Sequence, residues 1–71
     1  DGMCKVMLWG KRVRVECEDM SKVCVYDMNG KLYSCSDVGE GAEITLHSGQ
    51  YILKVEKKNN QRLLTKKIQV R

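Results

Sequence analysis

The sequence contains no proline, only one histidine and no long apolar run. A membrane-spanning helix needs about 20 consecutive apolar residues, and no stretch approaches that length, so the sequence predicts no membrane span. A signal peptide is not visible either, so a secreted protein would be represented here in a mature or truncated form. A length of 71 residues suits one domain and is too short for two. We therefore treat 1–71 as a single domain in which 1–2 form a frayed lead-in.

Recognisable catalytic and metal-binding patterns are also missing. His47 is the single histidine, and no G-x-S-x-G motif or phosphate-binding loop accompanies it. A solvated histidine at a strand end is therefore the simpler interpretation. The four cysteines include no C-x-x-C pair, which gives little support to zinc, and the carboxylates form no spaced calcium loop. The sequence predicts no active site, no metal and no cofactor.

The formal net charge of +4 comes mainly from the C-terminal third of the chain. A basic stretch can bind nucleic acid, but no aromatic residues are interleaved here to stack on bases. Lysine and arginine on outward strand positions also protect the edges of sheets. We therefore expect no nucleic-acid partner. The residues concerned are Lys54, Lys57, Lys58, Arg62, Lys66, Lys67 and Arg71, against Glu56.

Apolar residues alternate with polar ones in short runs, and no helical periodicity is present. The runs predict strands at 3–9, 12–18, 22–26, 43–47, 51–57 and 62–71, a return strand beginning at residue 32, and a loop over 34–41. Short strands at near-regular spacing are typical of an antiparallel β-sandwich of immunoglobulin-like kind. Tyr51 follows Gly49 and Gln50 at a strand start, where its hydroxyl is placed to hold the preceding corner.

The first hairpin turns through Gly10 and Lys11, and a glycine first in a two-residue loop suits a type II′ turn. In that register one face is apolar and brings two thiols together at a non-hydrogen-bonded position, where side chains approach most closely. We therefore predict a Cys4–Cys17 disulfide. The facing pairs are Leu8–Val13, Val6–Val15 and Cys4–Cys17.

The central hairpin turns at Asp27-Met28-Asn29-Gly30, and it permits two registers. A two-residue loop sets Cys24 opposite Cys35 and Tyr26 opposite Tyr33, with the cysteines at a hydrogen-bonded pair that suits a disulfide less well. A three-residue loop with Gly30 as a bulge instead leaves Cys24 outside. In that second register the inner face carries Val23, Val25, Tyr33 and Cys35.

Four cysteines in so short a chain favour disulfides, and hence a periplasmic or extracellular location. The alternative is four small buried thiols. A second open question concerns Met3, Met7 and Trp9, which share the polar face of the first hairpin with two arginines. This apolar patch is either a partner-binding face or a surface covered by arginine stems or by segments outside this chain.

Three stretches are similar to motifs of one bacterial family, the type A C-terminal domain of the type IX (Por) secretion system. Residues 23–32 resemble its V-x-V-Y-D-x-x-G-K-L hairpin, 48–55 its S-G-x-Y-I-L-K-V strand, and 65–70 its closing T-K-K-I-x-V. The match runs from about residue 22 to residue 71. The family's pattern falls on Tyr26, Asp27, Gly30, Gly49, Tyr51, Lys54, Lys66 and Lys67.

This resemblance implies an immunoglobulin-like, non-catalytic domain that directs a secreted cargo of a Gram-negative bacterium across the outer membrane. Its implied partner is the secretion machinery. Two features depart from the family: members usually begin with an Asn-Pro segment, and four cysteines are unusual for them. The same style of sequence occurs in small stand-alone immunoglobulin-like secreted proteins. The alternative expectation is therefore a secreted or periplasmic protein-interaction module.

Overall fold

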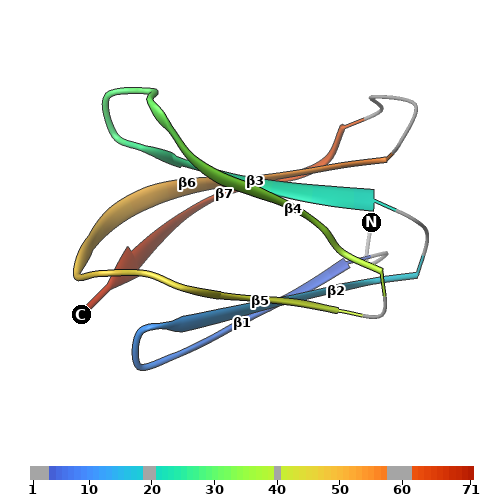
Figure 1. Cartoon of the computed structure of the whole chain (residues 1–71), viewed down its shortest axis with the longest axis horizontal. Coiled ribbons are helices and arrows are strands. Elements are labelled where there is room, and N and C mark those ends of the chain that lie inside the picture. The colour runs from blue at the N-terminus through green and yellow to red at the C-terminus, as the bar shows by residue number, and fades with distance from the viewer. Residues whose placement is uncertain (1–3, 19–20, 40, 58–61) are drawn as a thin grey trace.

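The computed structural model describes residues 4–18, 21–39, 41–57 and 62–71. Within these ranges the chain forms two antiparallel sheets that lie face to face as two layers (Figure 1). This all-β sandwich confirms the predicted fold class. The strands are β1 (Cys4–Trp9), β2 (Arg12–Cys17), β3 (Ser21–Asp27), β4 (Leu32–Asp37), β5 (Ala42–Thr45), β6 (Gly49–Lys57) and β7 (Arg62–Val70).

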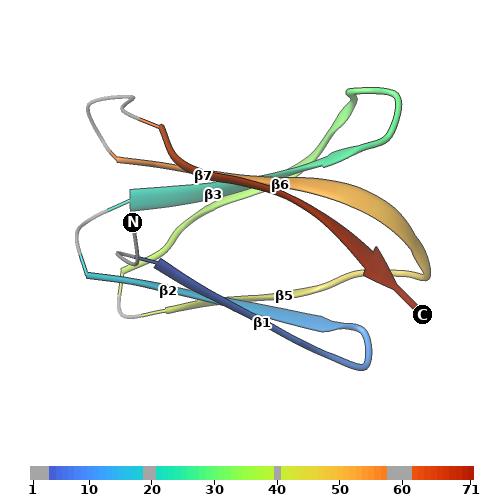
Figure 2. The ribbon, with the colours of Figure 1, turned by 180° about the vertical axis from the view of Figure 1, so that it is seen from behind.

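The chain crosses between the layers three times, after β2, after β4 and after β5. One sheet has the order β1-β2-β5 and the other has the order β4-β3-β6-β7, so β3 pairs with β6 although two strands separate them in sequence. A chain that passes back and forth between two packed sheets in this way has the Greek-key arrangement of immunoglobulin-like sandwiches. Figure 2, which views the molecule from behind, brings β7 to the front as an edge of its layer.

The core lies between the two sheets and consists mainly of alternate residues of β2, β3 and β6. Burying a valine or leucine side chain contributes about 1.5–3 kcal/mol, so the alternation seen in the sequence is also the main source of stability. The side chains with no exposed surface are Val13, Val15, Val23, Val25, Leu53 and Val55.

The first hairpin has the predicted register throughout. Val6 faces Val15, Leu8 faces Val13, and Cys4 faces Cys17. The two cysteines form a disulfide across a Cα–Cα distance of 4.1 Å. Because a regular two-residue turn fixes every pair behind it, the local sequence was sufficient to predict this disulfide.

The central hairpin uses both registers that the sequence left open, one in each half. Cys24 lies opposite Cys35, whereas Tyr26 lies opposite Leu32, because the extra residue Tyr33 interrupts the pairing as a β-bulge. The cysteines form a second disulfide, and their Cα atoms are 4.1 Å apart. That separation is typical of a non-hydrogen-bonded pair, so the hydrogen-bonded geometry expected from a two-residue loop was wrong.

Several element boundaries also differ from the prediction; β5, for example, covers Ala42–Thr45 where 43–47 was expected. β4 continues to Asp37, whereas a loop was expected from residue 34, and β6 already begins at Gly49. After β4 the chain turns inward at Val38, which is only 1% exposed and whose N–H donates to the carbonyl oxygen of Ser21 at 2.8 Å. This single valine closes the core where the chain crosses between the layers.

Candidate protein-recognition surface

The outward side chains of the four-stranded sheet lie in rows across neighbouring strands. Residues paired in an antiparallel sheet point to the same face, so the register assigns each row directly. The disulfide occupies the middle of this face, and cationic side chains lie mainly on β6 and β7. The rows are Leu32–Tyr26–Ile52–Lys67, Cys35–Cys24–Lys54–Thr65, and Asp37–Lys22–Glu56–Arg62.

A shallow depression of about 310 Å³ lies on this face, over β3, β6 and β7. We call it the outer groove. The Tyr26 ring and the Ile52 side chain supply apolar surface, and cations come from β6 and β7. Its lining residues are Tyr26, Gly30, Ile52, Lys54, Arg62 and Thr65.

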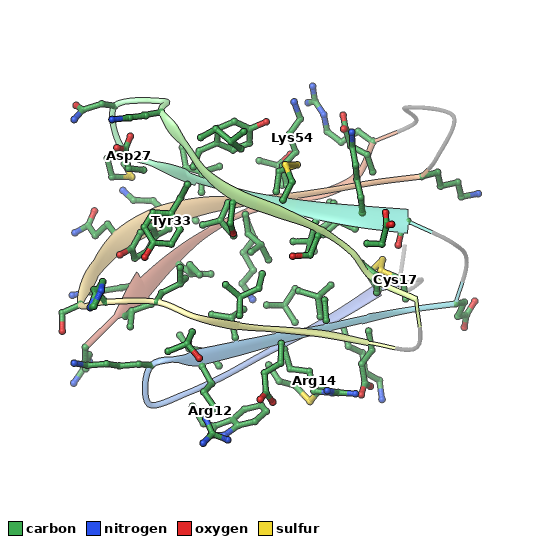
Figure 3. All side chains as sticks on the ribbon, in the orientation of Figure 1. Arg12, Arg14, Cys17, Asp27, Tyr33 and Lys54 are labelled. Carbon is green, nitrogen blue, oxygen red and sulfur yellow. A yellow bond between two sulfur atoms is a disulfide. The ribbon has the colours of Figure 1, made fainter. Side chains whose placement is uncertain are left out.

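Lys54 lies in the middle of the outer groove, and Figure 3 shows its side chain pointing away from the space between the sheets. Its Nζ is 6.0 Å from the centroid of the Tyr26 ring, at the outer limit of a cation–π contact, and 3.9 Å from Oε2 of Glu56. Arg62 forms no ion pair within the described ranges. The groove therefore combines an apolar floor with positive charge that its own carboxylate neutralises only in part.

The turn at one end of the groove is held by Asp27, labelled in Figure 3. Its Oδ1 accepts hydrogen bonds from the N–H groups of Asn29 and Lys31, both at 2.9 Å. Gly30 has a φ of 84°, a conformation that residues with a side chain rarely adopt. With no side chain, Gly30 leaves the end of the groove open.

Tyr51 holds a second corner at the same end of this sheet, where it pairs with Asp27 across β3 and β6. Its hydroxyl donates a hydrogen bond of 2.9 Å to the carbonyl oxygen of His47, which confirms the predicted tyrosine corner. The Tyr51 ring also meets the ring of Tyr33 edge-on, with centroids 5.6 Å apart. A Cβ on Gly49 would lie 3.6 Å from the Tyr51 ring, so this glycine borders the corner.

The structure divides the eight residues of the motif pattern into separate groups. It brings Tyr26, Gly30 and Lys54 together in the outer groove. Lys67 lies beside Ile52 in the same row, and Lys66 is exposed at the position opposite Leu53. The remaining three belong to the two corners: Asp27, Gly49 and Tyr51.

Sequence reasoning missed three residues of the groove, namely Ile52, Arg62 and Thr65. Ile52 carried a usable signal, because it is an apolar residue at an outward position between the inward Tyr51 and Leu53. Arg62 and Thr65 were assigned to the basic last strand without a partner surface. Only the pairing of β7 with β6 places them beside Tyr26 and Lys54.

The outer face of the three-stranded sheet carries the other candidate patch. Met7 lies opposite Arg14, and Trp9 lies opposite Arg12 with 46% of its surface exposed. Met7 is half-buried, whereas Trp9 stays open to solvent. Met3, the third member of this patch, lies outside the described residues.

Ion pairs link the charged side chains on this second face. Arg14 Nε donates to Oε2 of Glu16 at 2.9 Å, and an Arg12 nitrogen lies 3.9 Å from Oε1 of Glu43 (Figure 3). The hydrogen bond to Glu16, and the nearby charges of Glu16 and Glu43, raise the pKa of Arg14. The guanidinium also lies against Gly41, where a Cβ would come within 2.5 Å of it. This packing keeps Arg14 flat on the sheet.

Reactive groups are scattered over the molecule. Both cysteine pairs form disulfides, which leaves no free cysteine in the described ranges. The His47 side chain is exposed. Within the same ranges, no three histidine, cysteine or carboxylate side chains gather where they would hold a metal ion, and no helix is long and apolar enough to span a membrane.

Comparison of the chain with protein-family models and with curated proteins finds no match.

Proposed function

We propose that this chain is a non-catalytic recognition domain that directs a secreted bacterial protein across the outer membrane, in the manner of a type IX C-terminal sorting domain. Its partner is the secretion machinery. Its location is the periplasm, the cell surface or the medium of a Gram-negative bacterium. The two disulfides are compatible with such an oxidising location.

One observation carries the proposal. The three stretches that resemble the sorting-domain motifs are far apart in sequence, yet they form the central hairpin, β6 and β7 of one sheet. Their outward residues Tyr26, Gly30, Lys54 and Thr65 all line the outer groove. A shared surface built from separate motifs is what recognition by a partner requires, whereas independent turn signals need no common face.

The test is export of a passenger fused in front of this chain in a bacterium with a type IX system. We expect the passenger to reach the medium or the cell surface, and a strain without the system to retain it. The double variant Tyr26→Ala/Lys54→Gln should reduce export, and Lys5→Gln on the opposite sheet should not. Retention of the passenger in the periplasm, with the domain folded, would contradict the sorting function.

A specific observation favours a second candidate, a free-standing interaction module. Trp9 is 46% exposed on the edge strand β1, on the same outer face as Met7, and large exposed apolar side chains are typical of partner-binding sites. Trp9→Ala should then abolish capture of a purified partner that Lys54→Gln still captures. The intact mass of the native precursor separates the two candidates, because a sorting domain requires a cargo in the same chain.

A further inference from the structure

The outer groove holds more positive charge than the molecule itself neutralises. Arg62 forms no ion pair among the described residues, although Glu56 faces it across the strands, and Glu56 lies 3.9 Å from Lys54 instead. Next to the groove, Lys67 is the cross-strand neighbour of Ile52 and also forms no ion pair in the part of the chain that the structure describes. A guanidinium binds a carboxylate through paired hydrogen bonds. Charge complementarity therefore points to an acidic ligand.

The spacing of the rows defines the length of that ligand. The row of Tyr26 and the row of Arg62 are four residues apart along β6, through Ile52, Lys54 and Glu56. At about 3.3 Å per residue this distance is roughly 13 Å, the reach of an extended peptide of about five residues. The depression is shallow and open, so it suits a peptide laid across a sheet better than an enclosed small molecule.

We propose that the outer groove binds an extended acidic peptide segment of a partner protein. An apolar side chain of the peptide packs on Tyr26 and Ile52, and its carboxylates pair with Lys54 and Arg62. Gly30 leaves the apolar end open for chain entry. This inference rests on the proposed recognition function and deepens it by naming the chemistry of the partner.

The free edge of β7 is a poorer place for the same peptide. Seven consecutive residues, from Leu64 to Val70, are paired regularly on the β6 side, which leaves the other edge available to an added strand. However, Lys66 occupies an inward position on this edge and is exposed. An inward-pointing charge on an edge strand disfavours pairing with another strand. The outer groove, and not the edge, is the favoured site.

The probe is a capped pentapeptide with leucine first, glutamate third and fifth, and serine between them. It is titrated into the oxidised 71-residue chain and followed by amide chemical shifts. We expect shifts at Tyr26, Ile52 and Lys54, and affinity that falls as salt is added. Arg62→Gln should weaken binding about tenfold, because it removes the charge-assisted pair. A peptide with glutamines in place of the glutamates should bind the unsubstituted chain no better than the glutamate peptide binds the Arg62→Gln variant.

Lys66→Gln is the matched control, since it removes the same charge from the same strand but from the other face. It should change the affinity less than twofold, and thermal unfolding checks that each variant is folded. Equal weakening by Arg62→Gln and Lys66→Gln would overturn the proposal, as would shifts centred on Trp9. The chain should also be mixed with anionic lipid vesicles. If it binds them and both variants weaken that binding equally, the proposal is overturned, because the attraction is then unspecific.

The export assay is independent of this titration. If the passenger is exported but the groove does not bind the peptide, only the proposal of an acidic ligand is overturned. Peptide binding without export supports the groove ligand and contradicts the sorting function alone.

Discussion

The two outer faces of this sandwich differ in how their charges are arranged. On the three-stranded sheet each arginine of β2 has a carboxylate partner, Glu16 for Arg14 and Glu43 for Arg12. On the four-stranded sheet Arg62 forms no ion pair in the described ranges, although Glu56 faces it, and it lines the same groove as the apolar ring of Tyr26. The two arginines of β2 are thus neutralised within the molecule, whereas, in the described part of the chain, Arg62 on the other face is not.

This difference shows that basic residues alone are a poor guide to a binding surface. Exposed ion pairs contribute little to stability, but each pair reduces the attraction of that face for a charged partner. The face with free cations and an accessible apolar floor is therefore the stronger candidate for recognition.

The largest expected effect comes from the disulfides, one in each sheet. They close loops of similar length, with sequence separations of 13 and 11 residues. Loop-closure entropy predicts a loss of about 3 kcal/mol for either C4A/C17A or C24A/C35A. Urea unfolding of the two double variants measures this directly. A much larger loss in one hairpin would show that its disulfide also maintains the native register.

Removing the Asp27 carboxylate should have the next largest effect. Asp27→Ala leaves the N–H groups of Asn29 and Lys31 without their acceptor and should cost about 1–1.5 kcal/mol in the free energy of unfolding. Asp27→Asn keeps an oxygen acceptor and serves as the control. Equal destabilisation by both substitutions would contradict the hydrogen-bonding role. If the turn shapes the groove, Asp27→Ala should also weaken peptide binding.

A smaller loss, about 1 kcal/mol, is expected from Tyr51→Phe, because it removes the hydrogen bond to the His47 carbonyl. Tyr33→Phe is the matched control. The Tyr33 ring meets the same core residue, but its hydroxyl forms no hydrogen bond within the described ranges. Chemical denaturation of both variants separates the hydroxyl from the ring. An unchanged Tyr51→Phe variant would mean that the corner is held by packing alone.

The smallest effect is expected from a double variant that tests how the two outer faces of the sandwich differ in charge. E16Q/E43Q removes the carboxylates that pair with Arg12 and Arg14, so it creates free cations on the three-stranded sheet. We expect the urea midpoint to stay within experimental error and the affinity for the acidic pentapeptide to change less than twofold, because this face lacks the apolar groove. Strong new binding of the pentapeptide near Trp9 would show that free positive charge is sufficient for peptide binding without an apolar groove.

Much of the fold could be predicted because short-range rules determine it. Alternation located the strands, and the turn at Gly10-Lys11 fixed the Cys4–Cys17 pair. The central hairpin was only partly predictable, since its two registers differ by one residue. Tyr33 decides between them as a bulge, and its ring contacts Tyr51 from a strand far along the chain.

The sequence by itself determined the strand content, the first disulfide, the Asp27 turn and the tyrosine corner. Each depends on residues within about 15 positions of one another, where backbone geometry leaves few alternatives. Only the tertiary structure decided which strands are neighbours, and therefore which outward residues meet. Tyr26, Lys54 and Arg62 became one surface because β3, β6 and β7 pair side by side. The reason is that the buried faces of both sheets must cover each other, a condition that no single strand contains.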